Sequence, residues 1–217
     1  MYTRALLVTL ASVLIPPFPT LAQQDALPEQ NTITVVLYFE AEHAPITLSH
    51  LQREVEFIMG PLGLQFQWRL GKCVANGDVF HHLVVVHFKG RCEMGEYPSW
   101  EVASGSLGAA EMSEGKLMPF CRIECNRVRE FIRPLVRGES FIQMHVLLGR
   151  ALGRVLAHEL YHILADTTHH GSSGVTKSFL TPEELVDRAL KLQSQDSKAF
   201  DRGLARSFGA PGVGDGR

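Results

Sequence analysis

The sequence His158-Glu159-Leu160-Tyr161-His162 is the one place in this chain where residue spacing and chemistry coincide. Its two histidines are four residues apart, so on a helix they lie one turn apart on the same face and can direct both imidazoles at one metal ion. Glu159 projects beside that pair, where its carboxylate can hold a metal-bound water and take its proton. The motif therefore indicates a zinc-dependent hydrolase.

The residues before this motif have the apolar spacing of one long buried helix. Apolar side chains recur at helical spacing between Ser140 and Leu164, no proline interrupts them, and Ser140 is suited to be the N-cap. Burying two histidines and a glutamate on such a helix without a partner would cost several kcal/mol. A metal site therefore explains the motif better than a core helix with two hydrogen-bonded histidines.

Two later histidines are candidates for a third ligand. Each comes eleven or twelve residues after His158, so the chain must fold back from the helix end to bring one of them to the metal. His170 stands directly before Gly171, whose freedom at positive φ permits a tight reversal. The predicted ligands are His158, His162 and His170, with His169 as the alternative third ligand and Asp166 as a weaker one.

The run from His158 to His170 resembles the zincin metallopeptidases, and its layout is similar to the metzincin branch. That branch reads H-E-x-x-H-x-x-G-x-x-H, whereas here Ala165 stands at the glycine position and Thr168 at the position of the third histidine. The resemblance implies a metzincin-like site with a longer turn. It also implies an α+β fold, with one catalytic domain in which a mixed twisted sheet packs on a backing helix and a long active-site helix.

The chain before the motif alternates strands with a helix. Residue types predict strands over 32–39, 64–70 and 80–88, and a helix over 45–59 that is closed by Gly60-Pro61. The apolar run of residues 83–86 is typical of a more fully buried strand. Periodicity alone gives only a mixed α/β arrangement, and metzincin-like catalytic domains begin in the same way.

A short hairpin of small residues is predicted around Ser113-Glu114-Gly115, followed by a helical piece over 121–136. In metallopeptidases of this layout, an edge strand ahead of the active-site helix pairs with extended substrate through main-chain hydrogen bonds. We expect residues 105–112 to be that strand because small residues let another backbone approach closely, and an ordinary surface hairpin is the alternative. The predicted substrate-binding residues are Gly105, Leu107, Gly108 and Ala109.

Two segments follow the motif. Residues 171–174 form a glycine- and serine-rich loop that could wrap under the metal. Thr181-Pro182-Glu183-Glu184 then has the residue types of a helix start, with an N-cap threonine and a capping-box glutamate. An apolar face extends this predicted helix to about Ser194; its members are Leu185, Ala189, Leu190 and Leu192.

The cysteines favour disulfides rather than a metal site. The four are Cys73, Cys92, Cys121 and Cys125. In an exported protein an even number predicts two disulfides, with three possible pairings among which the sequence does not choose. The spacing of the first two lacks the short paired arrangement of zinc ribbons, so we expect the cysteines to staple loops around the core.

The N-terminus has the pattern of a secretory signal peptide. An apolar stretch over 5–18 follows Arg4 and leads to Thr20-Leu21-Ala22, which predicts cleavage after Ala22 and a secreted or periplasmic protein. About fourteen apolar residues are short of the ~20 that span a bilayer, so no membrane anchor is expected after cleavage. Residues 1–22 are then the signal peptide, 23–31 a polar leader that could act as a pro-segment, 32–202 the metallopeptidase domain and 203–217 a disordered tail.

Composition limits the partners. A chain of 217 residues that is 45% hydrophobic suits one globular domain, and a formal net charge of −2 gives no sign of nucleic acid as a partner. We therefore expect an exported Zn²⁺-dependent metalloendopeptidase that acts on peptide or protein substrates, with Glu159 as general base. The alternatives are a secreted non-catalytic zinc-binding or interaction domain, which would not need Glu159, and a zinc amidase acting on cell-wall or small amides.

Overall fold

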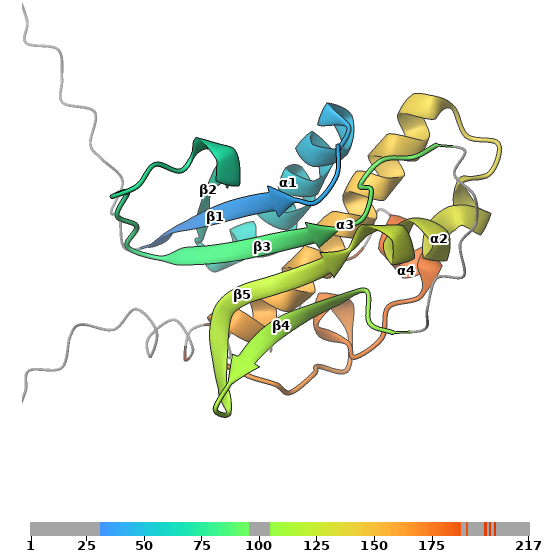
Figure 1. Ribbon diagram of the computed structural model, residues 1–217. Helices are drawn as coiled ribbons and strands as arrows, with labels where there is room; N and C mark the ends of the chain where they lie inside the picture. Colours follow the sequence, from blue (N-terminus) through green and yellow to red (C-terminus); the bar gives the residue numbers. More distant parts are fainter. Residues whose placement is uncertain are drawn as a thin grey trace, which may run out of the picture.

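A twisted sheet with two long helices on one face forms the body of the molecule in this computed structural model, which describes residues 31–95, 105–187, 190, 198, 200 and 202 (Figure 1). The α+β architecture expected from the sequence is confirmed. The strands are β1 (Thr32–Phe39), β2 (Gln65–Leu70), β3 (Leu83–Lys89), β4 (Gly108–Ser113) and β5 (Lys116–Glu124). The helices are α1 (Pro45–Met59), α2 (Cys125–Val136), α3 (Phe141–Leu164) and α4 (Pro182–Val186), with short 3-10 turns η2 (Gly60–Leu62), η3 (Gly71–Cys73) and η4 (Gly174–Thr176).

The sheet is mixed, in the strand order β2-β1-β3-β5-β4. The pairs β1/β2, β1/β3 and β3/β5 are parallel, whereas β4 pairs antiparallel with β5. The predicted hairpin of small residues is therefore present, and its first strand is an edge strand. One side of β4 pairs with β5, and among the described strands none pairs with its other side.

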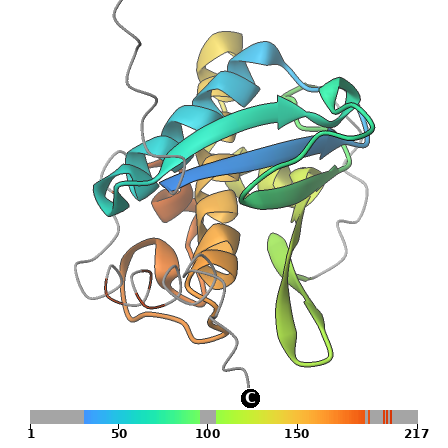
Figure 2. The same ribbon diagram turned by 90° about the vertical axis from the view of Figure 1, so that its left-hand side faces the viewer.

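The two long helices lie side by side on the same face of the sheet (Figure 2). Because the long helices cover one face, buried and half-buried residues alternate along the central strand β3. Val84, Val86 and Phe88 are buried there, while Val85 and His87 are half-buried. The strand expected to be more fully buried thus has one fully buried face and one half-buried face.

Glycine lets α3 approach α1 closely. A Cβ at Gly149 would lie 2.5 Å from the carbonyl oxygen of Thr47, and a Cβ at Gly153 would lie 2.8 Å from that of Leu51. Any larger side chain at these positions would push the helices apart, because the contacting atoms belong to the backbone of α1. The two glycines thus set the distance between α3 and the backing helix.

A buried arginine ties three helices together. Arg154 of α3 is 1% exposed, and its Nε donates to the Glu54 carboxylate of α1 at 2.7 Å. Its two terminal nitrogens donate to the carbonyl oxygens of Glu184 and Asp187 at the end of α4. Arg150 binds the carbonyl oxygen of Val186 in the same way, at 2.6 Å. These bonds fix α4 and the segment before it against α3.

The last helix is shorter than predicted. The capping box of Thr181 and Glu184 is confirmed, but α4 ends at Val186 because Asp187 turns to an extended conformation at ψ 161°. Its final carbonyl groups point to the arginines of α3 instead of continuing the helix. Ala189 and Leu192 lie outside the described residues, as do the predicted signal peptide, most of the polar leader and the tail at 203–217. Among the described helices, none combines the length and apolar character that would be needed to cross a bilayer.

The cysteines form one disulfide instead of the two expected. Cys92 bonds to Cys125 with a Cα–Cα distance of 5.0 Å, whereas Cys73 and Cys121 are free. Cys73 follows β2 and Cys121 lies in β5, three strands away across the sheet, or about 14 Å at the usual spacing between strands. That distance is beyond the reach of a disulfide, whose Cα atoms lie within about 7 Å. The predicted helix over 121–136 was also wrong at its start, because β5 continues to Glu124.

Candidate metal centre

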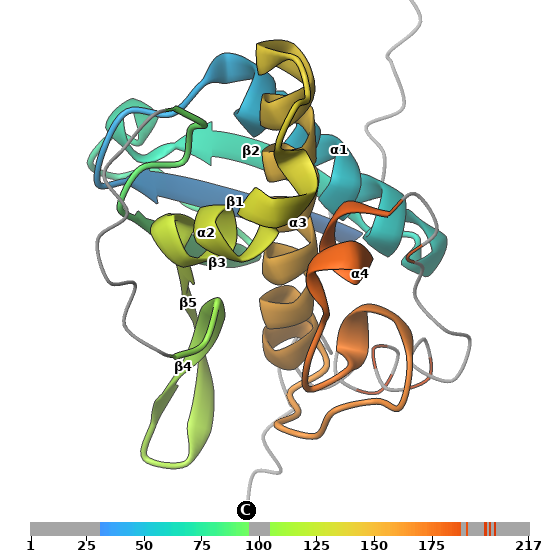
Figure 3. The same ribbon diagram turned by 90° about the vertical axis from the view of Figure 1, so that its right-hand side faces the viewer.

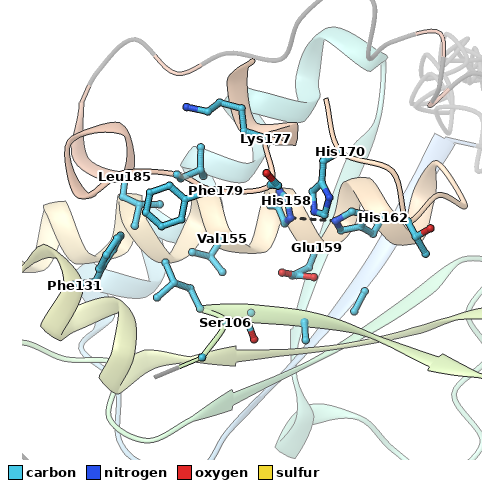
Figure 4. Close-up of a pocket in the computed structure, with 18 of the residues that line it drawn as sticks. Ser106, Phe131, Val155, His158, Glu159, His162, His170, Lys177, Phe179 and Leu185 are labelled. Atoms are coloured by element: carbon cyan, nitrogen blue, oxygen red, sulfur yellow. Dashed lines mark hydrogen bonds between the residues drawn. The ribbon is translucent and has the colours of Figure 1, made fainter. Parts of the chain in front are cut away.

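Three histidines converge at the C-terminal end of α3. His158 and His162 lie one turn apart, and their Nε2 atoms are 3.1 Å from each other. The ring of His170, which comes from the segment after the helix, lies 5.2 Å and 4.8 Å from their ring centroids (Figure 4). One ligand atom from each of the three lies within 4.8 Å of the other two, so this group could hold a metal ion.

A turn at the end of α3 brings His170 back to the helix. The helix ends at Leu164, and Asp166 then adopts a left-handed conformation at φ 46°. The short polar side chain of aspartate tolerates this region, which most residues avoid. Asp166 therefore makes the reversal that we had assigned to Gly171, and that prediction is wrong. The left-handed residue comes one position later than in the metzincin pattern and His170 follows it by four positions instead of three, so the turn is two residues longer.

The outer nitrogens of the two helical histidines are held by main-chain carbonyl groups. His158 Nδ1 lies 2.8 Å from the carbonyl oxygen of Val175, and His162 Nδ1 lies 2.7 Å from that of Thr167. A carbonyl oxygen can only accept, so each Nδ1 carries the proton and each Nε2 presents a lone pair. Val175 belongs to η4, directly after the glycine- and serine-rich loop over 171–174.

This arrangement fits a cation. Two Nε2 lone pairs that face each other at 3.1 Å repel, because neither nitrogen has a proton to share. A tetrahedral zinc ion with Zn–N bonds of about 2.0–2.1 Å would place two such nitrogens about 3.3 Å apart. The donor set of neutral imidazoles with carbonyl-bound outer nitrogens is also the usual surrounding of a protein metal site.

Burial keeps the helical histidines neutral. It lowers the pKa of His158 to about 4, against the raising effect of the Val175 carbonyl. The pKa of His162 is also lowered, mainly by burial and further by His170. A histidine ligand must be neutral, so both side chains are ready to bind a metal at neutral pH without first losing a proton.

Glu159 lies beside the cluster in a different environment. Burial raises the pKa of its carboxyl group to about 7, while a hydrogen bond from the main chain of Ala110 and the charge of Arg122 act in the opposite direction. The side chain is 5% exposed and lines the same pocket as the three histidines. A buried carboxyl group with a pKa near neutrality is suited to accept and return a proton.

His169, the alternative third ligand, lies outside the cluster. Its side chain is exposed, and its main-chain N–H donates to the hydroxyl of Thr167 at 3.2 Å. Only its neighbour His170 belongs to the group of converging ligand atoms found among the described residues. The turn at Asp166 thus selects between two adjacent histidines that sequence spacing left open.

An elongated pocket of about 520 Å³ extends from the histidines. Figure 3 shows the hairpin of β4 and β5 on one side of α3 and the segment leading to α4 on the other, and residues of both segments line the pocket. All four residues predicted to bind substrate line this pocket: Gly105, Leu107, Gly108 and Ala109. The far end is apolar, and its side chains in Figure 4 include Phe131, Val155, Phe179 and Leu185.

The apolar end of this pocket is formed by residues that the sequence did not single out as site residues. Phe131 comes from α2, Phe179 from the segment before α4 and Leu185 from α4. The rings of the two phenylalanines meet edge to face at 6.1 Å. No motif or spacing links residues that are so far apart in the chain, so only the folded structure shows that they share one wall.

Comparisons with known proteins identify the fold and not the family. No family model matches the sequence, and no curated relative matches it. Among solved structures, the chain is similar to archaemetzincin from Methanopyrus kandleri, with a TM-score of 0.51 and 13% identity over 83% of this chain and 99% of that one. The chain therefore shares the fold of archaemetzincin, which agrees with the fold expected from the sequence motif.

Proposed function

We propose that this protein is a Zn²⁺-dependent metallopeptidase in which His158, His162 and His170 hold the metal and Glu159 is the general base. The observation that carries the proposal is the pair of Nε2 lone pairs facing each other at 3.1 Å, with both outer nitrogens held by carbonyl groups. A structural histidine pair would share a proton at that distance. The adjacent carboxylate, which a purely structural metal site does not need, favours hydrolysis.

Different residues of the chain have different roles in the proposed peptide hydrolysis. A bound Zn²⁺ would supply a Lewis acid that polarises the scissile carbonyl and lowers the pKa of water. Glu159 takes the proton of the attacking water and passes it to the leaving amine. Val175 and Thr167 keep the two helical imidazoles oriented through their Nδ1–H groups.

The shape of the pocket supports an extended peptide as substrate. The edge strand β4 runs along one wall and can pair with a peptide main chain. The apolar end beside Phe131, Phe179 and Leu185 can receive one large apolar side chain of that peptide. We therefore propose a substrate with a bulky apolar residue next to the scissile bond.

Metal analysis and substrate cleavage test the function together. Purified wild type should contain one zinc per chain and cleave members of a peptide library, and a chelator should abolish the cleavage. His158→Ala and His170→Ala should lose the zinc, whereas His169→Ala should keep it. Zinc without cleavage of the peptide library or of cell-wall fragments would favour a binding module, and cleavage of cell-wall fragments alone would favour an amidase. Equal zinc in His169→Ala and His170→Ala would refute the ligand set.

We also propose that the protein is exported, with cleavage after Ala22. The apolar stretch and the Thr20-Leu21-Ala22 pattern support this proposal. N-terminal sequencing of protein recovered outside the cytoplasm should begin at Gln23. A mature chain that retains residues 1–22 would contradict it.

A further inference from the structure

The hydrogen-bonding pattern of β4 shows which of its main-chain groups face the pocket. The N–H of Glu124 donates to the carbonyl oxygen of Leu107 at 2.9 Å, so these residues form a hydrogen-bonded pair of the antiparallel ladder. Bonded and non-bonded pairs alternate along such a ladder. In the register Gly108↔Ile123 and Ala110↔Cys121, Gly108 and Ala110 therefore direct their N–H and C=O groups away from β5.

One of these outward groups already has a partner on α3. The main-chain N–H of Ala110 donates to the carboxylate of Glu159. The bond joins the predicted general base to the strand that we expect to bind substrate. It also explains why a buried carboxylate is tolerated here, since a charge-assisted hydrogen bond offsets part of the cost of burial.

Gly108 provides the space for this contact. A Cβ at Gly108 would lie 2.8 Å from Glu159 Oε1, 3.1 Å from Glu159 Cγ and 2.9 Å from Val155 Cγ1. Val155 and Glu159 are four residues apart, so they lie one above the other on α3, and the strand passes across both. Its cross-strand partner Ile123 is buried under the helices, so the missing side chain of Gly108 would point toward α3.

We propose that β4 forms a seat for the Glu159 carboxylate, in which the Ala110 N–H holds the group and the absent side chain of Gly108 makes room for it. Gly108 and Ala110 are then positioning residues for the general base. The absent side chain of Gly108 thus accommodates the side chain of Glu159, in addition to any peptide main chain that pairs with β4. A bound peptide would find the N–H and C=O of Gly108 and the C=O of Ala110 available, but not the Ala110 N–H.

Amide hydrogen exchange tests the seat without reference to activity or metal. In wild type, the Ala110 amide should exchange more slowly than the Gly108 amide, although both point away from β5. Glu159→Ala should accelerate exchange at Ala110 by about tenfold or more and leave Gly108 unchanged. Equal exchange at the two amides in wild type, or no response of Ala110 to Glu159→Ala, would overturn the proposal. Protection of Ala110 in a protein that cleaves no peptide would support the seat while refuting the proposed function.

The catalytic consequence rests on the proposed function and has its own test. Gly108→Ala should keep its zinc and its KM while kcat falls roughly 10- to 100-fold, because the base is displaced. Gly60→Ala is the matched control, since a Cβ there meets nothing within 4 Å. Glu159→Asp shortens the side chain by one methylene. When it is combined with Gly108→Ala, the losses in kcat should be non-additive. Additive losses, a change confined to KM, or loss of zinc in Gly108→Ala would overturn the proposal.

Discussion

The two halves of α3 differ in the residues that they carry and in what those residues contact. The first half, residues 141–154, packs on α1 through Gly149 and Gly153 and ends in the buried Arg154. The second half, residues 155–164, carries His158, Glu159 and His162 beside the pocket. In the first half two glycines allow close packing and Arg154 is bonded to the neighbouring helices, and in the second half the imidazoles of His158 and His162 face each other at a distance that suits a cation.

This difference suggests that the first half of α3 stabilises the fold and that the second half carries the chemistry of the site. A helix is stiff, so fixing its first half against α1 also fixes the direction in which His158 and His162 point. Changes in the first half should therefore lower stability and leave the chemistry of the folded protein intact. Substitutions in the second half should impair the chemistry and leave the stability of the fold intact.

The largest effect is expected at Glu159. Glu159→Gln removes the proton acceptor and keeps the size of the side chain, so kcat/KM should fall roughly a thousandfold. Thermal unfolding should show no loss of stability, because an amide is less costly to bury than a carboxylate. Peptide cleavage assays and a melting curve on the same sample measure both quantities. A destabilised variant would show that the second half also supports the fold.

Replacing the buried Arg154 should lower stability and leave the chemistry of the folded protein intact. Arg154→Met leaves Glu54 without its 2.7 Å partner and two carbonyl groups at the end of α4 without donors. The free energy of unfolding should fall by about 3 kcal/mol, as measured by denaturant titration. Arg137→Met, at an exposed arginine, is the control and should change it by less than about 0.5 kcal/mol. A similar small change at Arg154 would mean that the ion pair does not anchor α3.

Zinc should stabilise the protein through the second half of α3 together with His170. At a free Zn²⁺ concentration one hundred times the dissociation constant, the gain should be about 2.7 kcal/mol, measured as an increase in the melting temperature. His162→Ala should abolish this gain, and His169→Ala should retain it. A gain that survives in His162→Ala would place the stabilising metal elsewhere.

A single methyl group at the helix contact should weaken the fold. Gly149→Ala places a Cβ 2.5 Å from the carbonyl oxygen of Thr47, and separating the helices to accommodate it should cost about 2 kcal/mol. Gly60→Ala again serves as the control in open space. The zinc content of folded Gly149→Ala should equal that of wild type, and a loss of zinc would show that the two halves are not separable.

The smallest effect is expected at the start of the helix. The hydroxyl of Ser140 accepts from the N–H of Gln143 at 3.2 Å, so Ser140→Ala should lower stability by about 1 kcal/mol. Ser140→Asp keeps an acceptor at the N-cap and should restore the wild-type melting temperature. If both variants melt alike, the cap does not contribute.

Local patterns predicted most of the elements. The strand β1, the helix α1, the N-cap at Ser140 and the capping box at Thr181 follow from residue type and spacing, and the structure has all of them. Boundaries failed where another element competes for the backbone. Pairing with β3 and β4 keeps residues 121–124 in β5, and the arginines of α3 take the carbonyl groups that would have continued α4.

The sequence by itself determined that His158 and His162 share a face of a helix with Glu159 between them, because helical spacing is a property of the local chain. The tertiary structure alone decided that His170 and not His169 turns toward them, that Cys92 bonds to Cys125, and that Gly108 lies against Glu159. The disulfide and the contact of Gly108 depend on distances between elements that are remote in the chain, which sheet order and the packing of β4 across α3 set. The choice of His170 depends on the turn at Asp166, a conformation that residue spacing does not encode.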